Sequence, residues 1–122
     1  SLLRLSGDYT VVELNVEEGD WLEGRTLADC SLPEEGVTVL GIFRPSGRYV
    51  GVPQAETRIG AGDVLVLYGR VGALEDLDTR RAGASGEASH QRAVGEQERE
   101  VAAQEREEEE EEEEGKDEGG SG

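Results

Sequence analysis

Large apolar residues stop near residue 80, and this break limits where a folded core can form. Beyond residue 81, Val94 and Val101 are the only large apolar residues. That segment carries 15 acidic and 4 basic residues, a net charge of −11, whereas residues 1–81 carry 14 and 8, a net charge of −6. So little apolar surface cannot offset the conformational entropy that ordering the segment would cost. We therefore predict a linker or junction over residues 1–8, a folded domain over residues 9–78 and a disordered, Gly/Ala/Glu-rich acidic tail over residues 79–122.

Short apolar runs separated by turn residues predict the strands of the folded domain. Residues 9–16 alternate between apolar and polar side chains, which is the period of a half-buried strand. Residues 37–44 are strongly β-biased, and Pro45-Ser46-Gly47 is typical of a turn that returns the chain antiparallel over residues 48–52. Residues 64–68 are almost all apolar and therefore predict a buried central strand.

Two short helices complete the predicted order of elements. Thr26 is a suitable N-cap for a helix that ends before Pro33, and residues 73–77 have room for one or two helical turns. We predict an α+β domain: a small mixed or antiparallel β-sheet with one or two short helices, in the order β-α-β-β-β-α.

Composition also argues against several classes of function. The formal net charge of −17 argues against nucleic acid as a partner, because phosphate binding requires clustered Lys and Arg. Cys30 is the single cysteine, so no intramolecular disulfide can form and a reducing compartment is expected. No apolar run approaches the roughly 20 residues that span a bilayer. The sequence shows no pairing of a nucleophile with a base, because the one histidine, His90, falls in the predicted tail, and we expect no enzymatic activity.

Two polar motifs have a structural and a functional interpretation. Gly60-Ala61-Gly62 resembles part of a dinucleotide loop but precedes a strand rather than a helix, which favours a tight turn capped by Asp63. Four carboxylates between residues 17 and 23 could bind a divalent cation, but they lack the spacing of a calcium loop. A solvated turn is the favoured interpretation of these carboxylates, and a cation shared across a dimer remains the alternative.

Several of these features, taken in order, resemble the C-terminal domain of regulators of potassium conductance, the TrkA-C or RCK-C family. The resemblance covers residues 9–78. After the opening strand come Gly24-Arg25-Thr26-Leu27, Gly36 before an apolar strand that ends in Arg44, Pro53, and Gly60-Ala61-Gly62-Asp63-Val64-Leu65. The resemblance implies a cytoplasmic regulatory domain, attached to or associated with a membrane potassium channel, potassium transporter or cation antiporter. It also implies a homodimer, which agrees with the marginal core that about 60 to 70 residues can form alone.

In some members of this family a small ligand binds between the two protomers, and the resemblance gives candidate contacts. We predict a ligand cleft at Gly36, Val37, Thr38 and Pro53, with Arg44 as the partner of an anionic group. Members that bind cyclic di-AMP carry an Arg before the glycine and an Asn two residues after it. Here residues 32–35 supply no Arg and Thr38 stands at the Asn position, so cyclic di-AMP is a poor match. A small-molecule or nucleotide effector is possible, and its identity is left open.

Other interpretations of the same residues stay open at this level. Arg44, Arg48 and Arg58 either form an anion-binding patch or protect an edge strand from aggregation. Trp21 either caps the core or anchors a partner. The domain could therefore be a structural assembly domain without a ligand. Alternatively the chain could act through its acidic tail, whose run of eight glutamates, Glu107–Glu114, binds a basic partner or only confers solubility.

Overall fold

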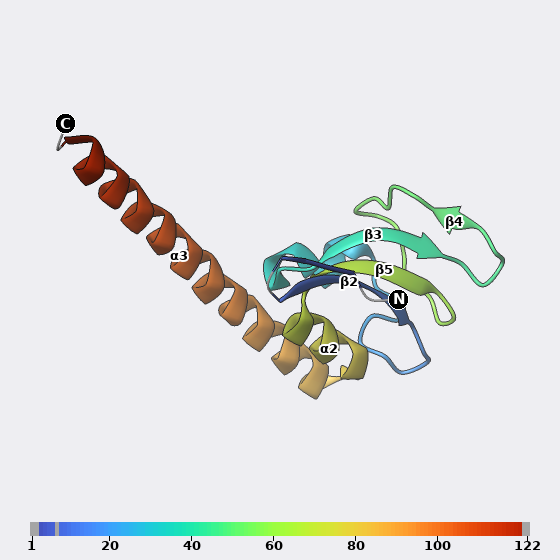
Figure 1. The fold of residues 1–122 in the computed structure, drawn as a ribbon. Coiled ribbons are helices and arrows are strands. Elements are labelled where there is room, and N and C mark those ends of the chain that lie inside the picture. Colours follow the sequence, from blue (N-terminus) through green and yellow to red (C-terminus); the bar gives the residue numbers. More distant parts are fainter. Residues whose placement is uncertain (1–2, 7, 121–122) are drawn as a thin grey trace.

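The chain folds as an antiparallel sheet with short helices on one face and one long helix extending beyond it (Figure 1). The computed structural model describes residues 3–6 and 8–120, with the side chains of residues 8–114. The strands are β1 (Leu3–Ser6), β2 (Tyr9–Asn15), β3 (Thr38–Phe43), β4 (Tyr49–Val50) and β5 (Val64–Arg70), and the helices are α1 (Leu27–Cys30), the 3-10 helix η1 (Leu32–Glu35), α2 (Val71–Thr79) and α3 (Ala84–Gly120).

The sheet has the strand order β1-β2-β5-β3-β4, and every neighbouring pair is antiparallel. From β2 to α2, the elements follow the predicted order β-α-β-β-β-α. The predicted α+β class is therefore confirmed, and the sheet is antiparallel rather than mixed. The predicted hairpin is also present, because Phe43 pairs with Tyr49 and Ile42 with Val50.

Strand β5 lies at the centre of the sheet, as its apolar sequence predicts. Leu65 and Leu67 point into the core with no exposed surface, and they pair with β2 on one side and β3 on the other. Val64, Val66 and Tyr68 occupy the opposite face and are half-buried. The strand is thus buried on one face only, and its continuous apolar sequence supplies both the core and a second apolar surface.

The core lies between the inner face of the sheet and the covering segments. One buried cluster makes up this core, and its members are Leu14, Val16, Trp21, Leu22, Cys30, Leu32, Val37, Ile42, Ile59, Leu65, Leu67, Ala73, Leu74 and Leu77. Fully burying a Leu, Ile or Val side chain contributes about 1.5–3 kcal/mol. A cluster of this size offsets much of the entropy of ordering a domain of this length.

Strand β1 lies within the segment predicted as a linker or junction, residues 1–8. Residues 3–6 form an edge strand, in which Leu3 pairs with Val11 and Arg4 with Thr10. The sequence Leu-Arg-Leu-Ser alternates apolar and polar residues, which is the period of a strand. So short a run gives a weak signal without its partner strand, and residues 1, 2 and 7 of the predicted junction lie outside the described residues.

Helix α3 corrects the prediction that the chain is disordered from residue 79. The helix starts at Ala84, and its first turns pack on the domain with Gly86, His90 and Ala93 buried. Further along, the Gln104 side-chain amide donates to the Tyr9 hydroxyl at 3.2 Å. Large apolar residues are not needed here, because small residues allow close approach and buried polar contacts replace apolar area. The structure describes residues 84–104 as helix in contact with the domain, where the sequence analysis placed part of a disordered tail, while the side chains of residues 105–114 are exposed.

Candidate functional site

An open groove lies between α1, η1 and the first half of β3, and we call it the α1–β3 groove. Its volume is about 450 Å³. The floor is mostly apolar, and Ser31, Glu34, Thr38 and Gln54 supply polar groups along it. The lining consists of Leu27, Ala28, Ser31, Leu32, Pro33, Glu34, Thr38, Val39, Pro53, Gln54 and Ala55.

Local sequence signals build the helical wall of this groove. Thr26 caps α1 reciprocally with Asp29: the Asp29 N–H donates to Thr26 Oγ1 at 3.2 Å, and the Thr26 N–H donates to the Asp29 carboxylate at 3.4 Å. Hydrogen bonding of the Asp29 carboxylate to the Thr26 side chain, and to a lesser degree to the Thr26 backbone N–H, lowers the pKa of Asp29. Ser31 adopts a left-handed conformation with φ of 48°, which turns the chain from α1 into η1. The Ala28 N–H donates to the Ala55 carbonyl at 2.9 Å and so ties the opposite rim to α1.

The predicted ligand contacts are only partly brought together. Thr38 and Pro53 both line the α1–β3 groove. Val37 is fully buried in the core instead. Gly36 ends η1 with φ of 81°, and a Cβ placed there would lie 2.3 Å from the side-chain oxygen of Gln97 on α3. Gly36 thus faces the long helix rather than the groove.

Arg44 lies outside the α1–β3 groove and has a structural role. Its Nη1 donates to the Asp63 carboxylate at 2.6 Å and to the Arg58 carbonyl at 2.8 Å. Asp63 is 2% exposed and also accepts from the Gly60 N–H at 2.8 Å. Asp63 therefore caps the turn before β5, as the sequence predicts, and Arg44 neutralises that buried carboxylate. The sequence neighbours of Arg44 gave no sign of this partner, which lies 19 residues away.

The carboxylates between residues 17 and 23 stabilise their own turn. The Glu17 N–H donates to the Asp20 carboxylate at 2.8 Å, and the Gly19 N–H donates to the Glu23 carboxylate at 3.1 Å. Arg81 also donates to Asp20 at 2.9 Å. Within the described residues, no group of three or more His, Cys, Asp and Glu is placed to hold a metal ion.

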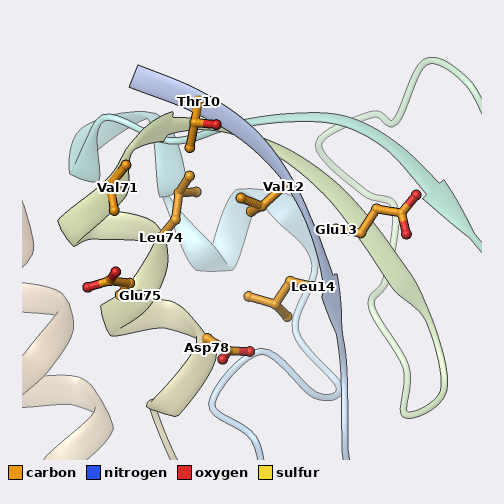
Figure 2. A pocket seen from close by; sticks show the side chains of 8 residues that line it. All are labelled: Thr10, Val12, Glu13, Leu14, Val71, Leu74, Glu75 and Asp78. Carbon is orange, nitrogen blue, oxygen red and sulfur yellow. The ribbon is translucent and has the colours of Figure 1, made fainter. Parts of the chain in front are cut away.

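A second groove, of about 380 Å³, separates β2 from α2 (Figure 2). Val12, Leu14 and Leu74 form its apolar floor, and Glu75 and Asp78 stand along the α2 side. It is lined by Thr10, Val12, Glu13, Leu14, Val71, Leu74, Glu75 and Asp78. None of the residues proposed from the sequence as ligand contacts lies in this groove.

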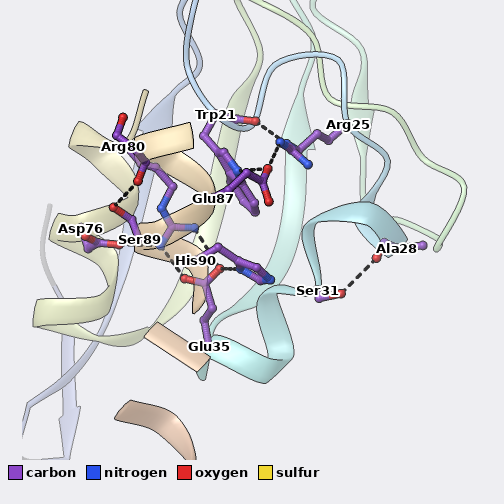
Figure 3. Close-up of polar contacts among 11 residues, drawn as sticks. Trp21, Arg25, Ala28, Ser31, Glu35, Asp76, Arg80, Glu87, Ser89 and His90 are labelled. Atoms are coloured by element: carbon purple, nitrogen blue, oxygen red, sulfur yellow. Dashed lines mark hydrogen bonds and ion pairs between the residues drawn. The ribbon is translucent and has the colours of Figure 1, made fainter. Parts of the chain in front are cut away.

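The sequence analysis missed a buried ionic cluster where α3 meets the domain (Figure 3). Glu35 of η1 accepts two bonds from Arg80, at 2.7 and 3.0 Å, and one from His90 Nδ1 at 2.6 Å. The side chains of Glu35 and Arg80 are each 1% exposed. Burial lowers the pKa of Arg80, but the hydrogen bonds and charges of Glu35 and Asp76 outweigh it and raise that pKa above its ordinary value.

Trp21 forms the second part of the contact with α3. Its ring stacks on His90 with centroids 5.1 Å apart, and its Nε1 donates to Glu87 at 2.9 Å. Arg25 lies over the same ring at 4.3 Å and also pairs with Glu87. The hydrogen bond from Trp21, followed by that from Arg25, lowers the pKa of Glu87, and desolvation opposes them. The ring of Trp21 thus sits in the core under α3 of its own chain.

The spacing of residues on α3 could have revealed this contact. Gly86, His90, Ala93 and Gln97 follow one another at intervals of four, three and four, which places them on one face of a helix. A search restricted to large apolar residues cannot find such a stripe.

The TrkA-C domain family matches residues 11–80. The chain belongs to the TrkA-C family. The matched range runs from β2 to the residue after α2 and includes the whole α1–β3 groove. Helix α3 lies beyond it. No curated protein matches the chain significantly.

Membership of this family identifies the chain as a regulatory domain associated with potassium transport. Among the residues that the structure describes, no helix combines the length and apolar character needed to cross a membrane.

Proposed function

We propose that this chain is a cytoplasmic, non-enzymatic module that binds a ligand, forms a homodimer and regulates a potassium or other cation channel or transporter. The observation that carries the proposal is the α1–β3 groove within the TrkA-C fold. Its volume of about 450 Å³ falls within the range of small-molecule sites, and its apolar lining has a few polar groups that could orient a ligand.

The lining also indicates what kind of ligand fits. Its one charged member is Glu34, a carboxylate, and no Lys or Arg is among the lining residues. A phosphate group would therefore find repulsion rather than a bidentate partner. The groove suits a neutral or cationic ligand with a flat apolar part and hydrogen-bonding edges, and this supports the view that cyclic di-AMP is a poor match.

Exposed apolar residues next to the groove support dimerisation. Leu40, Phe43 and Tyr49 are 42–49% exposed, and Val52 is 76% exposed. Phe43 and Tyr49 pack against each other with ring centroids 4.6 Å apart, and Leu40 and Val52 are sequence neighbours of the groove residues Val39 and Pro53. Apolar surface of this kind commonly marks an interface. Two protomers that meet there would enclose the groove, and a ligand could favour one dimer geometry over another.

A thermal-shift panel of nucleotides, nucleosides, amines and divalent ions tests ligand binding. A ligand at one hundred times its dissociation constant adds about 2.7 kcal/mol of stability. The groove-filling variant Ala28→Phe should abolish the shift, whereas Ala102→Phe, at an exposed position on α3, should retain it. A shift that persists in Ala28→Phe would place the ligand elsewhere.

Sedimentation of the intact chain at micromolar concentration tests dimerisation separately. If the chain dimerises but no compound raises its thermal unfolding midpoint, a ligand-free assembly domain is the alternative function. The exposed apolar residues favour this alternative. Stable monomers would contradict both interpretations. An interaction through the acidic segment is a further alternative, favoured by the exposed side chains of Glu107–Glu114.

A further inference from the structure

The 3-10 helix η1 connects the α1–β3 groove with helix α3. Leu32, Pro33 and Glu34 line the groove. Glu35, the next residue, is buried and bonded to His90 of α3, and Gly36 lies under Gln97 of α3. The first three residues of η1 therefore line the groove, and its last residue and its cap contact α3. A shift of η1 at the groove would disturb its contact with α3, and the reverse.

We infer that α3 regulates the α1–β3 groove: its docking against η1 fixes the groove wall, and its release frees that wall. This inference rests on the proposed function of the groove. By thermodynamic linkage, any ligand that prefers the fixed wall strengthens the docking of α3 by the same factor. A partner that pulls on α3 would likewise change the affinity of the groove.

The contacts of α3 are suited to reversible docking. The Glu35–Arg80–His90 cluster is charged and buried, and such clusters specify geometry more than they add stability. The buried residues that α3 itself supplies are small or polar, namely Gly86, His90 and Ala93. Helix α3 thus buries little apolar surface of its own, so its release exposes less than the loss of a core helix would.

Two glycines of α3 provide a matched pair of variants. A Cβ at Gly86 would lie 2.0 Å from the Arg81 carbonyl oxygen and 2.7 Å from Trp21 Cδ1, so Gly86→Ala should force the helix away. A Cβ at Gly95 would meet only Arg99 Nη1, at 3.6 Å, so Gly95→Ala should leave docking intact. Both substitutions replace Gly by the better helix former Ala. Any difference in behaviour between the Gly86→Ala and Gly95→Ala variants therefore reports contact of α3 with the domain.

The chain carries one intrinsic probe for each end of the coupling. Trp21, the single tryptophan, lies under α3, and its fluorescence reports docking. Cys30, the single cysteine, is fully buried on the inner side of α1, and burial raises its pKa to about 12. Its rate of reaction with a disulfide reagent such as DTNB therefore reports movement of the α1–η1 wall.

Both probes should respond together in the full-length chain. In Gly86→Ala we expect Trp21 emission at longer wavelength and a faster Cys30 reaction, by about tenfold for each 1.4 kcal/mol of docking free energy lost. Gly95→Ala should match the parent chain in both. A Trp21 shift without a faster Cys30 reaction would overturn the coupling.

A second variant covers the case in which the helix accommodates the new methyl group. Ala93 is 8% exposed against the domain, so Ala93→Glu introduces a charge into the contact. If neither Gly86→Ala nor Ala93→Glu changes Trp21 emission, α3 is not docked as the inference requires and the inference is wrong. Neither measurement uses a ligand, so this failure is distinct from failure of the ligand panel.

Discussion

Removing the charge of Glu35 should destabilise the chain more than removing any other single carboxylate charge near it. In Glu35→Gln, the buried guanidinium of Arg80 keeps its charge and loses its bidentate carboxylate. Breaking a buried ion pair in this way costs about 3–5 kcal/mol. Asp76 is still present to pair with Arg80, but its side chain is 41% exposed, and we therefore expect the lower end of that range.

The neighbouring residue provides the control for this prediction. Glu34→Gln makes the same chemical change one residue away, at an exposed position on the groove side of η1. It should alter stability by no more than about 0.5 kcal/mol. A loss of about 3 kcal/mol corresponds to a fall in Tm of roughly 12–24 °C for a domain of this size. Urea and thermal unfolding followed by circular dichroism measure both quantities.

A third variant separates the charge from the shape of the pair. Replacing both Glu35 and Arg80 by Met removes the two charges and retains similar volume. Such replacements of buried pairs are often neutral or stabilising. The double variant should therefore unfold at a higher temperature and a higher urea concentration than Glu35→Gln alone. If the free energies of unfolding of Glu35→Gln and Glu34→Gln differ by less than about 1 kcal/mol, the carboxylate of Glu35 is not buried against Arg80 as described.

Three further predictions concern acid stability, the turn before β5 and the cap of α1. The folded state lowers the pKa of Glu87, so the stability that this carboxylate contributes is present above the ordinary glutamate pKa and is lost as the pH falls through the lowered value. Trp21 emission should therefore report release of α3 in that acid range. Glu87→Gln should release α3 at neutral pH. Asp63→Asn should cost about 1–3 kcal/mol in urea unfolding because it weakens a buried acceptor, whereas Asp78→Asn, at an exposed position, should change little. Thr26→Ala should cost about 1 kcal/mol through loss of the N-cap, and an unchanged urea midpoint would contradict the capping geometry.

The sequence predicted those elements whose determinants are local. Thr26 and Asp29 lie within one helical turn, so the cap of α1 is visible as a sequence motif. The apolar run of β5 and the turn around Asp63 are equally local. Such signals are independent of the rest of the fold, and this explains why the class and the order of elements are confirmed.

The candidate site was predicted only in part because it is assembled from distant segments. Thr38 and Pro53 reach the same groove from β3 and from the segment after β4. Glu35, Arg80 and His90 meet although 45 and 55 residues separate Glu35 from its two partners. The spacing of small residues around His90 indicates a packed helix face, but nothing in the sequence pairs His90 with Glu35 or Arg80, and charged residues are usually exposed. Long-range ionic contacts of this kind require the fold before they can be recognised.

Helix α3 contacts the domain through small and polar residues, whereas the other elements contribute large apolar residues to the core. A helix with an apolar stripe would be held without a fixed orientation, because hydrophobic burial is non-directional. Helix α3 instead presents a histidine, a glutamate and a glutamine that bond to the domain: His90 to Glu35, Glu87 to Trp21 and Arg25, and Gln97 to Arg70. Hydrogen bonds matched in this way fix orientation, and because each has a charged partner its net contribution is about 1.5–3 kcal/mol. The docked position of α3 is therefore specific, and because its polar groups can bond to water when the helix is released, docking is also reversible, as the proposed regulation requires.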